Sequence, residues 1–167
     1  MTNQLQISLI GNSHSAQVID LILPIQQIEF GVPITLKDQP DLLDIESNYH
    51  ATGGNFWGAF HDEKVIGTIA LIGIGNGQGV IRKMFVNKDF RGKEFGLAQQ
   101  LLENLIEYCK SENITDLYLG TVDVLKAAMR FYERNNFVKI DKKDLPEAFP
   151  IMSADNVFYH LEIGRSV

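Results

Sequence analysis

A loop that contains glycines and charged residues, between an apolar run and an amphipathic run, has the residue types that bind phosphate. The stretch FVNKDFRGKEFGLAQQLLENL covers residues 85–105 and carries Arg91, Gly92, Lys93 and Gly96 just before the amphipathic run. The start of a helix exposes unpaired backbone N–H groups and partial positive charge, so it attracts an anion. Glycine lets the backbone approach an oxyanion closely. On these grounds alone, the loop is equally consistent with an ordinary strand-to-helix connection whose charges face water.

Hydrophobic periodicity on both sides of the loop predicts the elements that must position it. Strands are predicted at residues 5–10, 55–62, 64–74, 79–86, 116–122, 137–140 and 156–163. Helices are predicted at residues 16–27, 41–50, 96–110 and 124–136, the first of them kinked or ended at Pro24. Strands that come first and then alternate with helices predict a mixed α+β (α/β) fold. It would have one mixed, mostly antiparallel sheet with helices on both faces.

Composition narrows the class of protein. The 167 residues are 45% hydrophobic and predict a single domain over residues 1–167. A net charge of −6 argues against nucleic acid as a partner and favours cationic acceptors such as a polyamine, an aminoglycoside-like molecule, or a lysine or N-terminal amine. No segment is predicted to cross a membrane or to direct secretion, so a cytoplasmic protein is expected. The lone Cys109 and four scattered histidines predict no metal site.

The order of elements and two motifs resemble the GNAT superfamily of acyl-CoA-dependent N-acyltransferases, most strongly over residues 80–140. In that family the loop reads Arg or Gln, two arbitrary residues, Gly, one arbitrary residue, then Gly or Ala. Arg91 and Gly96 match this pattern, whereas Glu94 stands where the family has its first glycine. The second hallmark is Phe-Tyr-Glu followed by a turn and Phe, found at 131–133 and Phe137.

Two further positions depart from the family. Asn136 replaces the usual glycine before that last Phe, and Asn tolerates the left-handed conformation of a helix end. Leu125 stands where many members have Asn.

The resemblance implies a GNAT fold in which a bulged strand opens a splay at the site of acetyl-CoA. The pantetheine arm would pair with the backbone of the strand 79–86, and the pyrophosphate would lie on the loop. The residues implied in cofactor binding are Met84, Phe85, Val86, Arg91, Gly92, Lys93, Glu94, Phe95, Gly96, Leu97 and Tyr132.

Acetyl transfer needs a neutral amine, an oxyanion stabiliser and a proton for the departing thiolate. By resemblance, Tyr132 is the acid and the backbone N–H of Val86 polarises the thioester, although Tyr132 also fits a packed aromatic. Glu29 is the candidate base, with Asp123 and His61 as alternatives, and each of the three also fits a surface position.

The tail at residues 141–156 is irregular and carries prolines. Phe149 and Met152, together with Phe158 of the last strand, either line an acceptor pocket or cover the core.

The sequence therefore predicts an N-acetyltransferase that moves an acetyl group from acetyl-CoA to a primary amine of a small molecule or a peptide, without a metal. The alternative is a non-catalytic acyl-CoA-binding or regulatory module, which Glu94 and Leu125 would suit. A homodimer is common for this fold, and the sequence does not decide for or against it.

Overall fold

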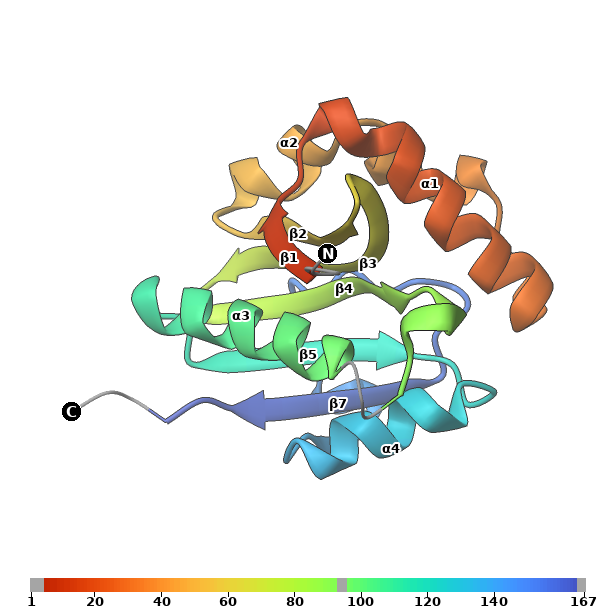
Figure 1. The fold of residues 1–167 in the computed structure, drawn as a ribbon. Helices are drawn as coiled ribbons and strands as arrows, with labels where there is room; N and C mark the ends of the chain where they lie inside the picture. The colour runs from red at the N-terminus through yellow and green to blue at the C-terminus, as the bar shows by residue number, and fades with distance from the viewer. Residues whose placement is uncertain (1–4, 93–95, 165–167) are drawn as a thin grey trace.

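The computed structural model describes residues 5–92 and 96–164, and its centre is one seven-stranded sheet (Figure 1). The strands lie side by side in the order β1 (Leu5–Leu9), β2 (Asn55–His61), β3 (Lys64–Gly75), β4 (Gln78–Val86), β5 (Asp116–Thr121), β7 (Val157–Glu162) and β6 (Val138–Ile140). Only β4 and β5 are parallel; every other neighbouring pair is antiparallel. The predicted mixed, mostly antiparallel sheet is confirmed.

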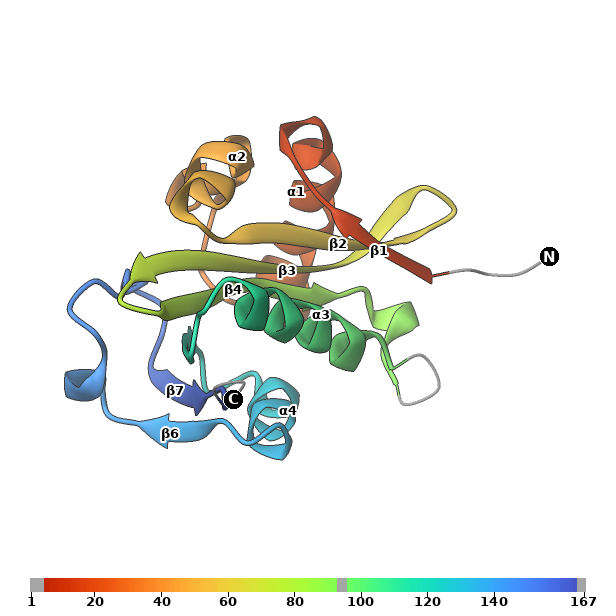
Figure 2. The same cartoon turned by 90° about the vertical axis from the view of Figure 1, so that its left-hand side faces the viewer.

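Helices cover both faces of the sheet, as predicted (Figure 2). Helices α1 (Ser15–Pro24) and α2 (Ile45–Asn48) lie over one face, and α3 (Leu97–Ser111) and α4 (Lys126–Arg134) lie over the other. Each amphipathic helix buries its apolar stripe against the strands. The larger core includes the leucines of α3, and a second core joins α1 and α2 to the opposite face. Within the described residues, no helix is long and apolar enough to cross a membrane.

A bulge in β4 interrupts the pairing between β3 and β4. Ala70 pairs with Arg82 and Thr68 pairs with Phe85, so β4 carries one residue more than β3 between these pairs. Lys83 lies at the bulge and has a left-handed φ of 53°. A bulge bends its strand, and this one lies at the middle of the sheet.

The parallel pair β4 and β5 separates beyond its first residues. Pairing is limited to residues 78–80 of β4 and 116–118 of β5. Residues 81–86 of β4 are therefore not paired with β5, and the edge of β4 is open there, inside the sheet. The sequence analysis expected both the bulge and this splay.

The first helix changes geometry at Pro24. The α-helix ends at that residue, and residues 25–29 form a wider π-helical turn. Proline lacks an N–H donor and clashes with the preceding turn, which accounts for the change. The wide turn carries Gln26, which hydrogen-bonds Gln39, and Glu29, which pairs with Arg91 of the loop after β4.

Candidate acetyl-transfer site in the splay between β4 and β5

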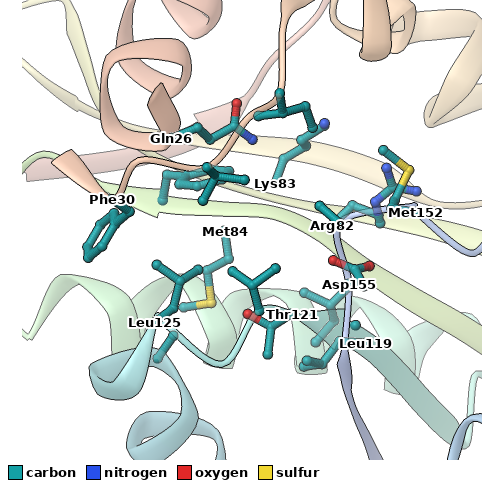
Figure 3. A pocket seen from close by; sticks show the side chains of 18 of the residues that line it. Gln26, Phe30, Arg82, Lys83, Met84, Leu119, Thr121, Leu125, Met152 and Asp155 are labelled. Carbon is teal, nitrogen blue, oxygen red and sulfur yellow. The ribbon is translucent and has the colours of Figure 1, made fainter. Parts of the chain in front are cut away.

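A cavity of about 130 Å³ occupies the splay (Figure 3). Residues 81–85 of β4 and 119–121 of β5 form two of its walls. Gln26 and Phe30 close it from the end of the first helix, and Leu125 and Tyr132 close it from α4. Met152, Ala154 and Asp155 complete the lining from the segment before β7. Five parts of the chain thus meet at the point where the central strands separate.

Tyr132 is both a packed aromatic and a lining residue of the cavity. Its ring contacts those of Phe137 and Tyr159, with centroids 5.5 and 5.9 Å apart, and it is 7% exposed. Its hydroxyl donates to Met84 Sδ at 3.6 Å, a weak hydrogen bond. Burial raises the pKa of Tyr132, and the Asp155 carboxylate adds to the effect. The hydroxyl therefore stays protonated at neutral pH.

The backbone of β4 faces the splay at the residues that the sequence analysis singled out. The Asn87 N–H donates to Ile66 O of β3 at 2.8 Å. Because successive residues of a strand point their N–H groups to opposite edges, the Val86 N–H points away from β3, as does that of Met84. The Val86 carbonyl also faces this way and accepts a 2.8 Å hydrogen bond from Arg91 Nε.

Two glycines flank the undescribed part of the loop before α3. Gly92 and Gly96 have φ values of 119° and 57°, which favour glycine. Gly96 is the N-cap of α3, and Leu97 begins the helix with a buried side chain. The predictions for Lys93, Glu94 and Phe95 concern residues outside those that the structure describes.

Glu29 lies against Arg91 and not in the cavity. Its carboxylate accepts two hydrogen bonds from the Arg91 guanidinium, the one from Nη2 at 2.9 Å. These hydrogen bonds lower the pKa of Glu29, with partial burial acting in the opposite direction. Arg91 also lies over the ring of Phe30 at 5.7 Å. The ion pair ties the end of the first helix to the predicted pyrophosphate loop, while the prediction of Glu29 as the base stays untested.

The other candidate residues are distributed between the cavity and the rest of the surface. His61 lies beside Phe90 at the end of β2, and Asp123 is exposed after β5; neither lines the cavity. Met152 does line it, whereas Phe149 and Phe158 pack together in a small core. Phe149 and Phe158 therefore cover the core, and Met152 stays a candidate for an acceptor pocket.

Sequence reasoning missed Asp155 as a residue of the site. Burial raises the pKa of Asp155, while the nearby Arg82 and Lys83 act to lower it. Gly120 of β5 makes room for it: a Cβ at that position would lie 2.5 Å from Asp155 Oδ2. The sequence shows only an acidic residue directly before the last predicted strand. That position alone does not indicate that the side chain lies at the splay.

The side chain of Lys83 at the bulge was missed as well. Its Nζ donates to Gln39 Oε1 at 2.5 Å and lies 3.6 Å from an Asp41 oxygen. Gln39 in turn donates to Gln26 at 2.9 Å, and Tyr49 donates to Asp41 at 2.5 Å. Burial lowers the pKa of Lys83 to about 8, against the attraction of Asp41. This network fastens the segment after the first helix onto the bulge and so fixes one side of the cavity.

Comparison with known proteins identifies this architecture. A Staphylococcus aureus Mu50 acetyltransferase of the GNAT family superimposes with a TM-score of 0.93 and 39% identity, covering 96% of this chain and 100% of that one. The PaiA N-acetyltransferase of Thermoplasma acidophilum, solved in complex with coenzyme A, shares the fold at a TM-score of 0.74 and 15% identity, with coverages of 95% and 99%. The Danio rerio N-acetylaspartate synthetase is 34% identical over 106 residues, which are 62% of this chain and 37% of that protein.

These likenesses place the protein in the class of acyltransferases. The model of the acetyltransferase (GNAT) family matches residues 19–137, and the chain belongs to that family. The chain spans well under half of the Danio rerio protein. Family membership confirms the resemblance that the loop and the Phe-Tyr-Glu motif indicated.

Proposed function

We propose that this chain is an N-acetyltransferase that moves the acetyl group of acetyl-CoA to a primary amine of a small molecule bound in the splay. One observation carries the proposal. Tyr132 and the free edge of β4 line the same cavity, and Phe30 of its lining lies under Arg91 of the loop before α3. This arrangement supports an acid, an N–H donor and an anion site that act together.

The residues fit acetyl-CoA along a line from the loop to the cavity. Residues 91–97 would hold the pyrophosphate through backbone N–H groups at the start of α3. The Met84 and Val86 edge would pair with the pantetheine amides in the manner of strand addition. Family membership supports this cosubstrate, and PaiA, which has the same fold, was solved with coenzyme A.

Bound acetyl-CoA would supply the acetyl group as a thioester. The amine nitrogen forms a bond to the carbonyl carbon, the carbon–sulfur bond breaks, and an amide and coenzyme A result. The Val86 N–H would stabilise the negative charge that develops on the carbonyl oxygen. Tyr132, kept protonated by its raised pKa, would give its proton to the thiolate.

The attacking amine must first lose a proton, and we assign its acceptance to Asp155. Of the described residues that line the cavity, Asp155 is the one with a carboxylate. Glu29 is held by Arg91, and its lowered pKa makes it a weak base. The raised pKa of Asp155 brings it closer to that of an amine, which favours proton transfer.

A small acceptor suits the size of the site. Its volume of about 130 Å³ is below the ~300–1,000 Å³ usual for drug-sized ligands. The name of the Danio rerio relative refers to an acetylated amino acid, which supports a small molecule over a protein side chain.

Calorimetric titration with acetyl-CoA, followed by thiol-release assays over a panel of amines, tests the proposal. Gly96→Glu places a side chain and a negative charge at the N-terminus of α3 and should abolish acetyl-CoA binding. Gly75→Glu is the matched control, since Gly75 also has a positive φ of 88° but lies in the β3–β4 turn with open space around it. Equal binding by both variants, or none by the parent protein, would refute the proposed cofactor site.

A non-catalytic acyl-CoA-binding module is the second candidate, favoured by Leu125 in the lining where many family members carry Asn. It predicts acetyl-CoA binding without turnover of any amine. Turnover that depends on the Tyr132 hydroxyl would exclude it.

A further inference from the structure

Two side chains of opposite charge lie at one end of the cavity without partners. Figure 3 shows Arg82 and Asp155 at the end where Met152 lies, away from Phe30 and Leu125. Both are half-buried. Neither forms an ion pair or a side-chain hydrogen bond with another residue in the described part of the chain. Partly buried charges are costly unless they are compensated, so this end of the cavity is suited to a ligand with both signs of charge.

Asp155 and Tyr132 both line the cavity, and Asp155 Oδ2 lies against Gly120 of β5. The Asp155 carboxylate contributes to the raised pKa of Tyr132, and Arg82 acts on Asp155. A ligand that spans the two charges would place its ammonium end at the Asp155 carboxylate and its anionic end at the Arg82 guanidinium.

Arg82 is free to take the anionic end, whereas Lys83 is not. Nζ of Lys83 is occupied by Gln39 and Asp41 on the other side of the bulge. The guanidinium of Arg82 is planar and matches a carboxylate through two parallel hydrogen bonds. Arg82 and Asp155 are therefore the two charged residues of the described lining that no ion pair engages.

We infer that the acceptor is a small amino acid, whose carboxylate binds Arg82 and whose amino group binds Asp155 next to the thioester. The inference rests on the proposed function and specifies its substrate class. A polyamine would meet Arg82 with a second positive charge, and an uncharged amine would leave Arg82 without a partner.

The test compares L-alanine with L-alaninamide, which differ in the carboxylate and keep the same carbon skeleton, alongside L-aspartate and spermidine. The parent protein should prefer the carboxylate form in kcat/KM by about tenfold or more. In Arg82→Gln the ratio of alanine to alaninamide should fall by about the same factor, because the rate with alaninamide does not depend on Arg82. Dividing the ratio in the variant by that in the parent cancels the different basicities of the two amines.

Three further variants keep the result interpretable. Arg82→Lys retains the charge and should keep part of the ratio. Asp155→Asn should lower the rates with both acceptors by a similar factor. Lys110→Gln removes an equal charge at the end of α3, outside the cavity, and should leave the ratio unchanged. Retained acetyl-CoA binding shows that each variant is folded.

Failure of the inference is distinguishable from failure of the proposed function. Turnover of alaninamide or spermidine at least as fast as of alanine, or an Arg82→Gln ratio equal to that of the parent, overturns the inference and leaves the acetyltransferase intact. If no amine is acetylated, calorimetry with L-alanine and L-alaninamide decides instead. Binding that needs both the carboxylate and Arg82 supports the amino acid site, and equal or absent binding overturns it.

Discussion

Replacing Tyr132 by Phe removes one hydroxyl from the proposed site and leaves its packing in place. The ring contacts with Phe137 and Tyr159 persist, since neither involves the hydroxyl. If Tyr132 protonates the thiolate, kcat should fall by about 10²–10⁴-fold, the usual contribution of a general acid. That factor corresponds to about 3–5 kcal/mol of transition-state stabilisation. The affinity for acetyl-CoA should change little.

The cost to folding should be small by comparison. The hydroxyl makes one weak hydrogen bond, to Met84 Sδ at 3.6 Å, so its removal should change the free energy of unfolding by no more than about 1 kcal/mol. The assays are thiol release at saturating amine, calorimetry with acetyl-CoA and urea unfolding of both proteins. The predicted signature is a large loss in kcat with nearly unchanged binding and stability.

Two results would refute this reasoning. An unchanged kcat would mean that Tyr132 is a packed aromatic alone and that water or another group protonates the thiolate. A fall in kcat matched by a loss of several kcal/mol in stability would mean that the hydroxyl supports the fold, and its assignment as the acid would lose its basis.

Three further substitutions test the neighbourhood of the cavity. Glu29→Gln should lower kcat by less than about tenfold if Glu29 is not the base. The substitution should also lower the free energy of unfolding by less than about 1 kcal/mol at pH 7, and this loss should disappear as the pH falls through the lowered pKa of Glu29. A thousandfold loss in kcat would contradict the expectation that Glu29 is not the base. Gly120→Ala places a Cβ 2.5 Å from Asp155 Oδ2 and should reduce kcat/KM for the amine without weakening acetyl-CoA binding; equal loss of both would count against it. Because the pKa of Lys83 falls from 10.5 unfolded to about 8 folded, its charged form destabilises the fold below pH 8. The free energy of unfolding should rise by about 3 kcal/mol from pH 8 to 10.5, a rise that Lys83→Met should remove in urea titrations.

Sequence analysis predicted the parts of this molecule whose signals are local. Alternating and helical periodicities located the strands and helices to within a few residues, because each buried face must repeat with the period of its element. Gly92 and Gly96 were singled out because glycine lets the backbone approach an anion closely, and both have a positive φ. Asn136, expected in a left-handed conformation, has a φ of 72°.

The missed residues depend on contacts between segments far apart in the chain. Arg82 and Asp155 are 73 positions apart in the numbering and meet because the bulge turns β4 away from β5 while the segment before β7 crosses the opening. The ion pair of Glu29 with Arg91 likewise depends on the π-helical turn after Pro24. Hydrophobic periodicity cannot predict such contacts, since each depends on how two elements pack against each other.

Net charge and the charges of the cavity favour different acceptors. A value of −6 averages over the surface, where exposed charges are screened by salt within about 10 Å. Inside the splay, water is limited, and the guanidinium of Arg82, on the free part of β4, acts much more strongly on a bound acceptor. A bound acceptor experiences Arg82, Lys83 and Asp155 before it experiences the surface. The overall charge therefore favours cationic amines, whereas the charges of the cavity favour an amine that carries its own carboxylate, and the comparison of spermidine with alanine distinguishes the two.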